Sequence, residues 1–160
     1  MADDSKVQQL KTDKKEAKKG YIHAVGRRKE AVARVRLYSE IKTGVVWGEN
    51  SIKKGEIYVN GKPIENYFPL AVQQIVYKEP LKITNALHRY AITIKVVGGG
   101  NSGQLDAVVH GISRALEKAD LSYRPILKKR EFLTRDARVR QRRKVGMGGK
   151  SRRKKQSPKR

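Results

Sequence analysis

Basic side chains are the residues of this sequence whose type and spacing best suit chemistry, and that chemistry is the binding of phosphate. One short stretch of the chain holds five of them: Arg27, Arg28, Lys29, Arg34 and Arg36. Arg presents a planar fork of N–H donors that matches phosphate oxygens, and Lys adds a point charge. We interpret these residues as candidate phosphate contacts. The alternative interpretation of 26–29 is an ordinary solvated turn.

A glycine-rich run at 98–104, GGGNSGQ, is a second candidate phosphate contact. Free backbone N–H groups at the start of a helix attract an anion, and glycine lets it approach closely. The run matches neither G-x-x-x-x-G-K-[ST] nor G-x-G-x-x-G, so it does not indicate a P-loop or a dinucleotide site. A tight strand-to-helix connection is the alternative. The candidate contacts are Gly99, Gly100, Ser102, Gly103 and Gln104.

Most of the excess positive charge lies in the last quarter of the chain. The 160 residues include 38 Lys and Arg against 15 Asp and Glu, a formal net charge of +23, and residues 124–160 alone hold 17 basic and 2 acidic residues. After residue 134 there are too few large aliphatic side chains to offset the roughly 1–2 kcal/mol that ordering each residue's backbone costs. We expect 134–160 to form a long basic tail that is ordered only by a polyanion. A generic solubility or localisation segment is the alternative.

Several classes of function are disfavoured by the residues that are missing. The sequence has no cysteine, and its three histidines, His23, His88 and His110, lack metal-ligand spacing, so we expect ordinary surface or core histidines and no metal. No catalytic arrangement of nucleophile, base and carboxylates is present, which indicates a protein that is not an enzyme and needs no cofactor. No window of about 18 uncharged apolar residues exists, and the N-terminus lacks a secretory signal, so we expect a cytoplasmic protein without a membrane partner.

The elements that position the cations are expected in the middle of the chain. Residues 21–25 and 31–38 are typical of two strands, with 26–29 between them as a turn or bulge. In the second strand Ala33, Val35 and Leu37 alternate with Arg34 and Arg36, which predicts one core face and one basic face. Further short elements are expected as a loop at 39–55 with a hairpin around 45–47, a strand at 56–59, a helix at 63–67 and a helix that begins at 69 and ends before Pro80.

The clearest elements are a strand at 90–97 and a long helix after the glycine run. An apolar stripe at Leu105, Val108, Val109, Ile112, Leu116 and Ala119 has helical spacing. Asn101 and Gln104 have the spacing of a capping pair for this helix. The predicted fold class is α/β (α+β): a mixed four-stranded sheet with helices on one face. The predicted organisation is a charged arm at 1–19, a globular domain at 20–133 and the extended basic tail at 134–160.

Composition therefore favours binding of RNA or DNA through phosphates. Only 6% of the residues are aromatic, which disfavours a platform that stacks single-stranded bases. Two other classes of protein remain as alternatives at this point. One is a small-molecule kinase that uses the glycine run, and the other is a nucleoid-type DNA compactor that uses the tail.

Seven motifs resemble one family, the universal small-subunit ribosomal protein number nine in its bacterial form. In chain order they are GRRKEAVARV at 26–35, YVNGKPIENYF at 58–68, VGGGNSGQ at 97–104, HGISRAL at 110–116, LTRDAR at 133–138, RKVG at 143–146 and the terminal KR at 159–160. The resemblance covers about 21–160. Relative to the family, the loop at 39–55 is longer, 1–19 is an additional arm, and no aromatic residue precedes the last residues.

The resemblance implies a ribosomal S5-domain-2-like fold whose tail threads into the head of the small subunit. It also implies that the body binds 16S-type ribosomal RNA beside neighbouring head proteins, and that the tip of the tail contacts the anticodon stem-loop of P-site tRNA through Ser157, Lys159 and Arg160. Besides Arg27–Lys29, Arg34, Arg36 and the glycine run, the residues implied to bind ribosomal RNA are Arg114, Thr134, Arg135, Arg138, Arg140, Arg142, Arg143, Lys144, Lys150, Arg152 and Arg153.

Overall fold

The computed structural model describes residues 20–39, 44–48 and 50–142. The arm at 1–19 and the part of the predicted tail at 143–160 lie outside the described residues. The described elements are β1 (Ile22–Arg28), β2 (Ala31–Tyr38), β3 (Val45–Trp47), β4 (Asn50–Ile52), β5 (Ile57–Val59), β6 (Lys62–Pro63), α2 (Ile64–Tyr67), α3 (Ala71–Ile83), β7 (Ala91–Val97), α4 (Asn101–Ala119), a 3-10 turn (Leu121–Tyr123) and α5 (Arg124–Lys129). No helix in the described part of the chain has the length and apolar character needed to cross a membrane.

The main sheet has five strands in the order β1-β2-β7-β5-β6. It is mixed, as predicted, because β5 runs parallel to β7 while the other neighbours are antiparallel. The predicted number of four strands was wrong by one. The fifth strand, β6, is only two residues long and pairs with β5 across the turn Asn60-Gly61, where both residues have positive φ. Two residues are too few to show an alternating pattern in a sequence.

Strand β1 is longer than its sequence indicates. It continues through Gly26 to Arg28, and the turn of the β1–β2 hairpin is Lys29-Glu30, with Lys29 at φ 51°. The prediction that 26–29 form a turn or bulge was therefore wrong for 26–28 and is confirmed only for Lys29. Gly26 is a strand residue that pairs with Ala33, and a Cβ there would lie 1.9 Å from the carbonyl oxygen of Ala107 in α4. The position requires glycine because a helix crosses close to the strand, not because the chain turns.

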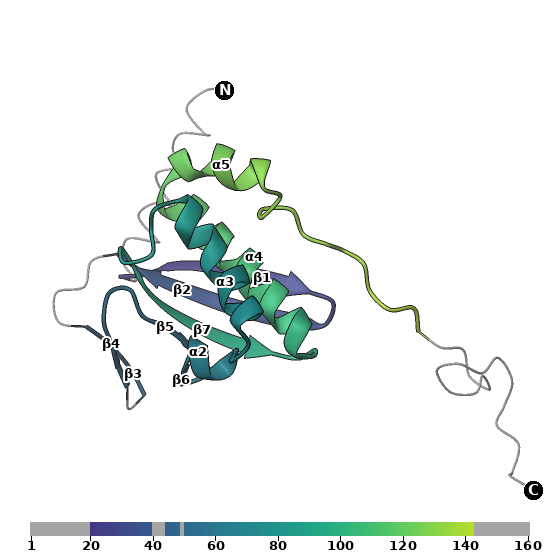
Figure 1. Ribbon diagram of the computed structural model, residues 1–160, viewed down its shortest axis with the longest axis horizontal. Helices are drawn as coiled ribbons and strands as arrows, with labels where there is room; N and C mark the ends of the chain where they lie inside the picture. The colour runs from purple at the N-terminus through teal and green to yellow at the C-terminus, as the bar shows by residue number, and fades with distance from the viewer. Residues whose placement is uncertain (1–19, 40–43, 49, 143–160) are drawn as a thin grey trace, which may run out of the picture.

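Helices cover one face of the sheet, as predicted, and the core lies between the two layers (Figure 1). Helix α4 packs on β1 and β2, and α3 and α5 pack beside it. The alternation predicted for β2 is confirmed, since Ala33, Val35 and Leu37 are buried and Arg34 and Arg36 are exposed. The stripe predicted for α4 is likewise confirmed, with Ala119 at its partly buried end. The central core residues are Ala33, Val35, Leu37, Ile92, Ile94, Val96, Val108, Ile112 and Leu116.

Two of the shorter elements compare differently with their predictions. The hairpin expected around 45–47 is confirmed as β3 and β4, which form a separate two-stranded sheet. Helix α3 does not end before Pro80 but continues to Ile83. Proline removes one backbone hydrogen bond from a helix interior. The helix persists because Tyr77, Pro80 and Leu81 are all buried against the core, and this burial favours continuation.

Candidate nucleic-acid interface

The face of the sheet opposite the helices is basic. Pairing between the strands places Arg34 beside Lys95, and places Arg36 between His23 and Thr93. Strand side chains alternate between faces, so all of these residues point away from α4. The separate β3–β4 hairpin brings Trp47 to the same face. Together they line a pocket of about 430 Å³ with Tyr21, which we call the sheet-face pocket: Tyr21, His23, Arg34, Arg36, Trp47, Thr93 and Lys95.

Arg28 binds other parts of the protein at the opposite end of β1. Its Nε donates to Oδ2 of Asp106 at 3.3 Å, and its Nη1 lies 3.0 Å from both Oδ1 of Asp136 and the carbonyl oxygen of Arg138. The Arg28 side chain is only 15% exposed. We call this set the tail root: Arg28, Asp106, Asp136 and Arg138. It joins the end of β1, the first half of α4 and the start of the C-terminal segment.

Asp136 is the central acceptor of the tail root. Its carboxylate accepts hydrogen bonds from the backbone N–H and the guanidinium of Arg138, with Nη2 at 2.6 Å from Oδ2. These hydrogen bonds, together with the charges of Arg138 and Arg28, hold the pKa of Asp136 well below its usual value. The carboxylate is therefore ionised at neutral pH. Its ion pair with Arg28 positions the start of the C-terminal segment against the end of β1.

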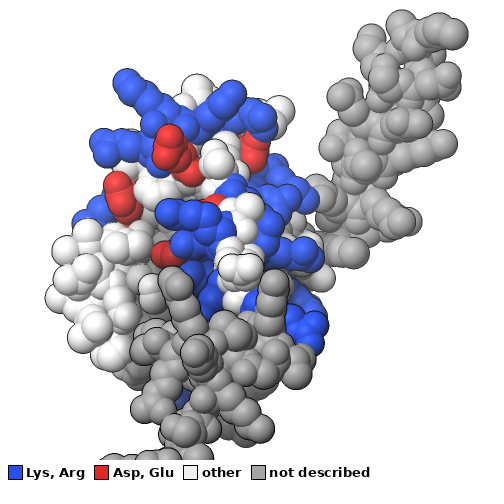
Figure 2. All heavy atoms as spheres, turned by 90° about the vertical axis from the view of Figure 1, so that its right-hand side faces the viewer, with Lys and Arg blue, Asp and Glu red and all other residues white. Residues whose placement is uncertain are grey.

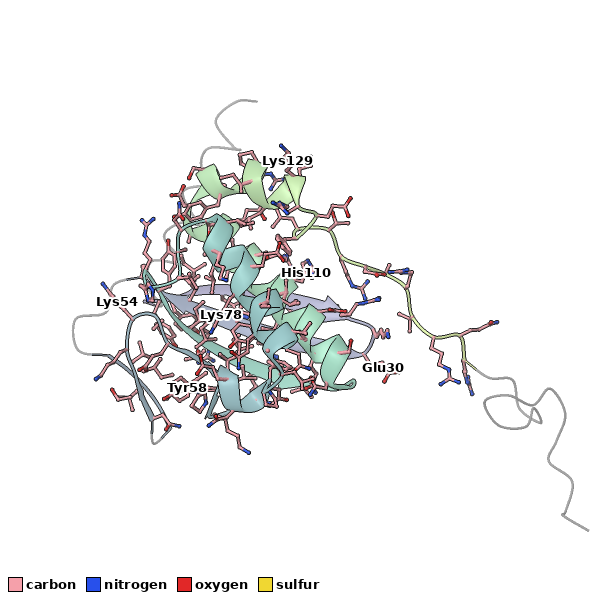
Figure 3. All side chains as sticks on the ribbon, in the orientation of Figure 1. Glu30, Lys54, Tyr58, Lys78, His110 and Lys129 are labelled. Atoms are coloured by element: carbon pink, nitrogen blue, oxygen red, sulfur yellow. The ribbon has the colours of Figure 1, made fainter. Side chains whose placement is uncertain are left out.

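His110 fixes the same segment from the side of α4 that faces it (Figure 3). The backbone N–H of Arg27 donates to its Nδ1 at 3.4 Å. Burial, followed by the charge of Arg114, lowers the pKa of His110 below its ordinary value of 6.5. The ring is thus neutral at pH 7, accepts a hydrogen bond from β1, and lines a cavity together with Thr134 and Asp136. In the described residues no group of three or more His, Cys, Asp or Glu side chains could hold a metal ion.

The glycine run makes a close connection between β7 and α4. Gly98 and Gly99 have φ of 76° and 64°, which favour glycine. A Cβ on Gly98 would lie 2.6 Å from the carbonyl oxygen of Glu30, and one on Gly99 would lie 2.9 Å from the Cβ of Ala31. These contacts support the interpretation as a tight connection for the first two glycines. Around Gly100, which precedes the helix, the space is open.

The capping pair predicted at the start of α4 was wrong. The capping position is Gly100, and no side chain bonds the free N–H groups there. Gln104 instead donates through Nε2 to the carbonyl oxygen of Gly98 at 3.0 Å and accepts through Oε1 from the hydroxyl of Tyr67 at 2.8 Å. Asn101 accepts from the side chain of Gln73. Both polar side chains are used by tertiary contacts that the helix pattern alone does not reveal.

The remaining described candidates lie on the surface around the tail root. Arg114 is exposed on α4 and donates through Nη1 to the carbonyl oxygen of Val25 at 2.6 Å. Figure 2 shows Lys and Arg gathered on this side of the molecule, with few acidic residues among them. The other exposed candidates are Arg27, Lys29, Ser102, Thr134, Arg135, Arg138, Arg140 and Arg142. The candidates outside the described residues are Arg143, Lys144, Lys150, Arg152, Arg153, Ser157, Lys159 and Arg160.

Comparison with known proteins agrees with the motifs. The family model described as ribosomal protein S9/S16 matches residues 26–160. The chain belongs to the ribosomal protein S9/S16 family. Two similar S9/S16 proteins are each named small ribosomal subunit protein uS9. The one from Maridesulfovibrio salexigens is 46% identical over 131 residues, which cover 82% of this chain and 91% of that protein. The one from Lawsonia intracellularis is 47% identical over 127 residues, which cover 79% and 88%.

The family assignment confirms the resemblance and bears on the other classes of function. S9/S16 proteins are structural components of the ribosome rather than enzymes, so the prediction that this chain is not an enzyme is confirmed. Membership of this family disfavours both alternative classes, the small-molecule kinase and the DNA compactor. The role of each predicted contact residue in RNA binding stays a prediction.

Sequence reasoning missed several residues that the structure places in the sheet-face pocket and the tail root of this S9/S16 protein. Lys95 completes the basic face, but only the pairing of β2 with β7 places it beside Arg34. Asp106 and Asp136 are ordinary surface acids in the sequence, and no local pattern links them to Arg28. Lys95 is the one charged residue of β7, whose sequence is AITIKVV, and a lone cation in an otherwise uncharged strand is a signal that could have indicated an exposed side chain.

Proposed function

We propose that this S9/S16 protein is a structural constituent of the small ribosomal subunit in the cytoplasm, held there by ribosomal RNA and neighbouring head proteins. The observation that carries the proposal is the gathering of Lys and Arg on one side of the molecule (Figure 2). Residues 135–142 leave the body on this side (Figure 1). A phosphate backbone supplies the negative charge that this surface lacks. The names of the two relatives support the same assembly.

The globular part, 20–133, acts in this proposal as the anchor on 16S-type ribosomal RNA. Its exposed cations, Arg27, Lys29 and Arg114 among them, neutralise phosphates at the hairpin end of the sheet. Phosphate contacts position a protein without reading sequence, so specificity comes from the shape of the folded RNA. Arg28 contributes indirectly, because it fixes the start of the tail against α4 and so sets the direction in which the tail leaves.

The tail, 134–160, reaches further into the head of the subunit in this proposal. Residues 135–142 contain no helix or strand and leave the body as an extended chain, which suits threading between RNA segments. Ser157, Lys159 and Arg160 at its tip bind phosphates of the anticodon stem-loop of P-site tRNA. Charge-assisted hydrogen bonds of this kind are short and roughly twice as strong as neutral ones.

Deletion of 157–160 tests the tip. We expect the deletion to weaken retention of P-site tRNA by purified small subunits, because two cations and a hydroxyl are lost, and to leave incorporation into the subunit unchanged. The measurement is filter binding of labelled tRNA across salt concentrations. The double variant Lys128→Gln, Lys129→Gln is a matched control, since it removes two exposed cations from α5.

Each part of the proposal has its own contradicting outcome. If subunits with the deletion hold tRNA as tightly as intact subunits at every salt concentration, the role of the tip is wrong. If the intact chain fails to sediment with the small subunit through moderate salt, the assignment as a subunit constituent is wrong.

A further inference from the structure

We propose that the sheet-face pocket binds a single unpaired nucleotide of RNA, with its phosphate on the cations and its base against Trp47. This inference rests on the proposed binding of RNA and adds a specific site to it. The pocket lies on the face of the sheet that none of the described helices covers, away from the tail root. It is a different surface from the phosphate contacts at the hairpin end.

The size of the pocket suits a small ligand rather than a helix of RNA. Its volume of about 430 Å³ lies within the roughly 300–1,000 Å³ of typical ligand pockets. Its floor is formed by three neighbouring strands, β1, β2 and β7, whose pairing fixes the side chains in rows. The β3–β4 hairpin adds Trp47 at one side. A concave site bounded by a hairpin admits one extruded nucleotide but not a stacked duplex.

Charge shows that the ligand is an anion. Arg34, Arg36 and Lys95 line the pocket, and none of its described lining residues is acidic. Two other cavities lined by described residues differ in this respect. One is lined by Asp106, Glu131 and Asp136, and the other by Glu56 and Glu65. Of these three cavities, the sheet-face pocket is the one whose described lining combines several cations with no carboxylate.

The aromatic residues indicate a nucleotide rather than phosphate alone. The guanidinium of Arg36 lies 5.0 Å from the centroid of the Tyr21 ring, and Tyr21 also packs on Tyr38 at 5.6 Å between centroids. These contacts hold Arg36 and Tyr21 in place before any ligand arrives. Trp47 is half-buried, which leaves part of its indole open to the pocket for a base to stack on.

The floor of the pocket also offers a polar group. Thr93 is 2% exposed and lies beside Arg36 in the strand pairing. Its hydroxyl can both donate and accept a hydrogen bond, which suits a base edge or a ribose hydroxyl. By composition alone, the low aromatic content of the chain disfavours the stacking of RNA bases. The fold changes this interpretation because it brings two of the few aromatic residues together beside three cations.

Fluorescence of the intact protein tests the proposal directly, since Trp47 is the single tryptophan of the chain. The full-length protein is titrated with an unstructured hexaribonucleotide, and binding to the whole protein is followed in parallel by anisotropy of a labelled copy. We expect a saturable change in Trp47 emission with the single strand. We expect no such change with inorganic phosphate, or with a duplex RNA at concentrations where anisotropy shows binding.

Variants assign the signal to the pocket. We expect Lys95→Gln to raise the RNA concentration at the midpoint of the Trp47 change. The double variant Arg36→Gln, Lys95→Gln should raise it by about tenfold or more, because charged hydrogen bonds to phosphate are lost. Lys95→Gln leaves the contact between Arg36 and Tyr21 intact, and circular dichroism checks the fold of each variant. The control is Lys128→Gln, Lys129→Gln, which loses the same charge from α5 and should shift the midpoint by less than about threefold.

The outcomes separate this site from RNA binding in general. Anisotropy that reports binding without any Trp47 change would overturn the pocket and leave the proposed function standing. An equal effect of the control variant, or an equal emission change with phosphate alone, would also overturn the nucleotide site. Absence of RNA binding by both measurements would overturn the pocket, whereas failure of the chain to sediment with the small subunit would overturn the proposed function.

Discussion

At the scale of residues, the same side chain serves different purposes according to its surroundings. Arg28 and Arg36 both belong to the hairpin of β1 and β2, and both are candidate phosphate contacts in the sequence. Arg28 is mostly buried and bound to Asp106, Asp136 and the backbone of Arg138. Arg36 lies on the uncovered face of the sheet, where its guanidinium meets an aromatic ring instead of a carboxylate.

His110 should make the stability of the protein sensitive to mild acid. Burial and the nearby charges of Arg114 and Arg135 lower its pKa in the folded state, so the unfolded chain binds the proton more tightly. The free energy of unfolding should therefore fall as pH drops below about 6.5, by about 1.4 kcal/mol for each unit by which the pKa is lowered, and should not depend on His110 above that pH. We expect His110→Gln to lose less thermal stability than the natural chain between pH 7.5 and pH 5.

The measurement is the midpoint of thermal unfolding by circular dichroism at each pH. Glutamine retains an oxygen that can accept from the N–H of Arg27, so the fold is preserved. His88→Gln, at an exposed position, controls for the loss of a histidine. Parallel pH curves for the natural chain and His110→Gln would contradict the prediction.

At the scale of elements, the hairpin of β1 and β2, the start of α4 and the C-terminal segment meet at one end of the sheet. Gly26 and Gly111 allow α4 to cross close to β1, and Gly98 and Gly99 allow the connection from β7 to pass against Glu30 and Ala31. The close approach places Asp106 and His110 where Arg28 and Arg27 reach them. The direction of the tail is therefore set by helix-to-strand packing.

Gly26→Ala should destabilise the protein strongly. The added Cβ would lie 1.9 Å from the carbonyl oxygen of Ala107 and 2.4 Å from the backbone nitrogen of Gly111, so helix and strand must separate. We expect a loss of about 3 kcal/mol or more in the free energy of unfolding, measured with urea. Gly100→Ala is the control, because its Cβ would meet no atom within 4 Å, and it should cost about 1 kcal/mol or less. Equal losses for the two variants would show that packing against α4 is not the cause.

At the scale of the whole molecule, the fold places the exposed cations in two separate groups. Helices cover one face of the sheet, and the cations of β2 and β7 remain on the other. A second set of cations surrounds the point where the chain leaves the body (Figure 2). The net charge of +23 makes association with RNA depend on the release of counterions from its phosphates.

Removal of 143–160 should reduce the salt dependence of RNA binding. This segment holds nine basic and no acidic residues. Each phosphate that is neutralised contributes about 0.7 to 0.9 to the slope of the logarithm of affinity against the logarithm of salt concentration, so the slope should become shallower by several units. Removal of 1–19, with six basic and four acidic residues, is a control of similar length and should change the slope little. A slope unaffected by loss of 143–160 would place the phosphate contacts elsewhere.

The sequence by itself determined the charge distribution, the alternation in β2, the strand β7, the long helix α4 and the family. These features can be read from residue counts, from a periodic pattern of nearby residues or from short motifs, without knowledge of distant contacts. Only the tertiary structure decided the extent of β1, the continuation of α3 through Pro80 and the partners of Arg28. Those partners are 78 and 110 residues away along the chain, and the register of β2 against β7 was equally needed to bring Lys95 into the sheet-face pocket. Contacts at such separations are chosen by packing and pairing, which a local pattern does not specify.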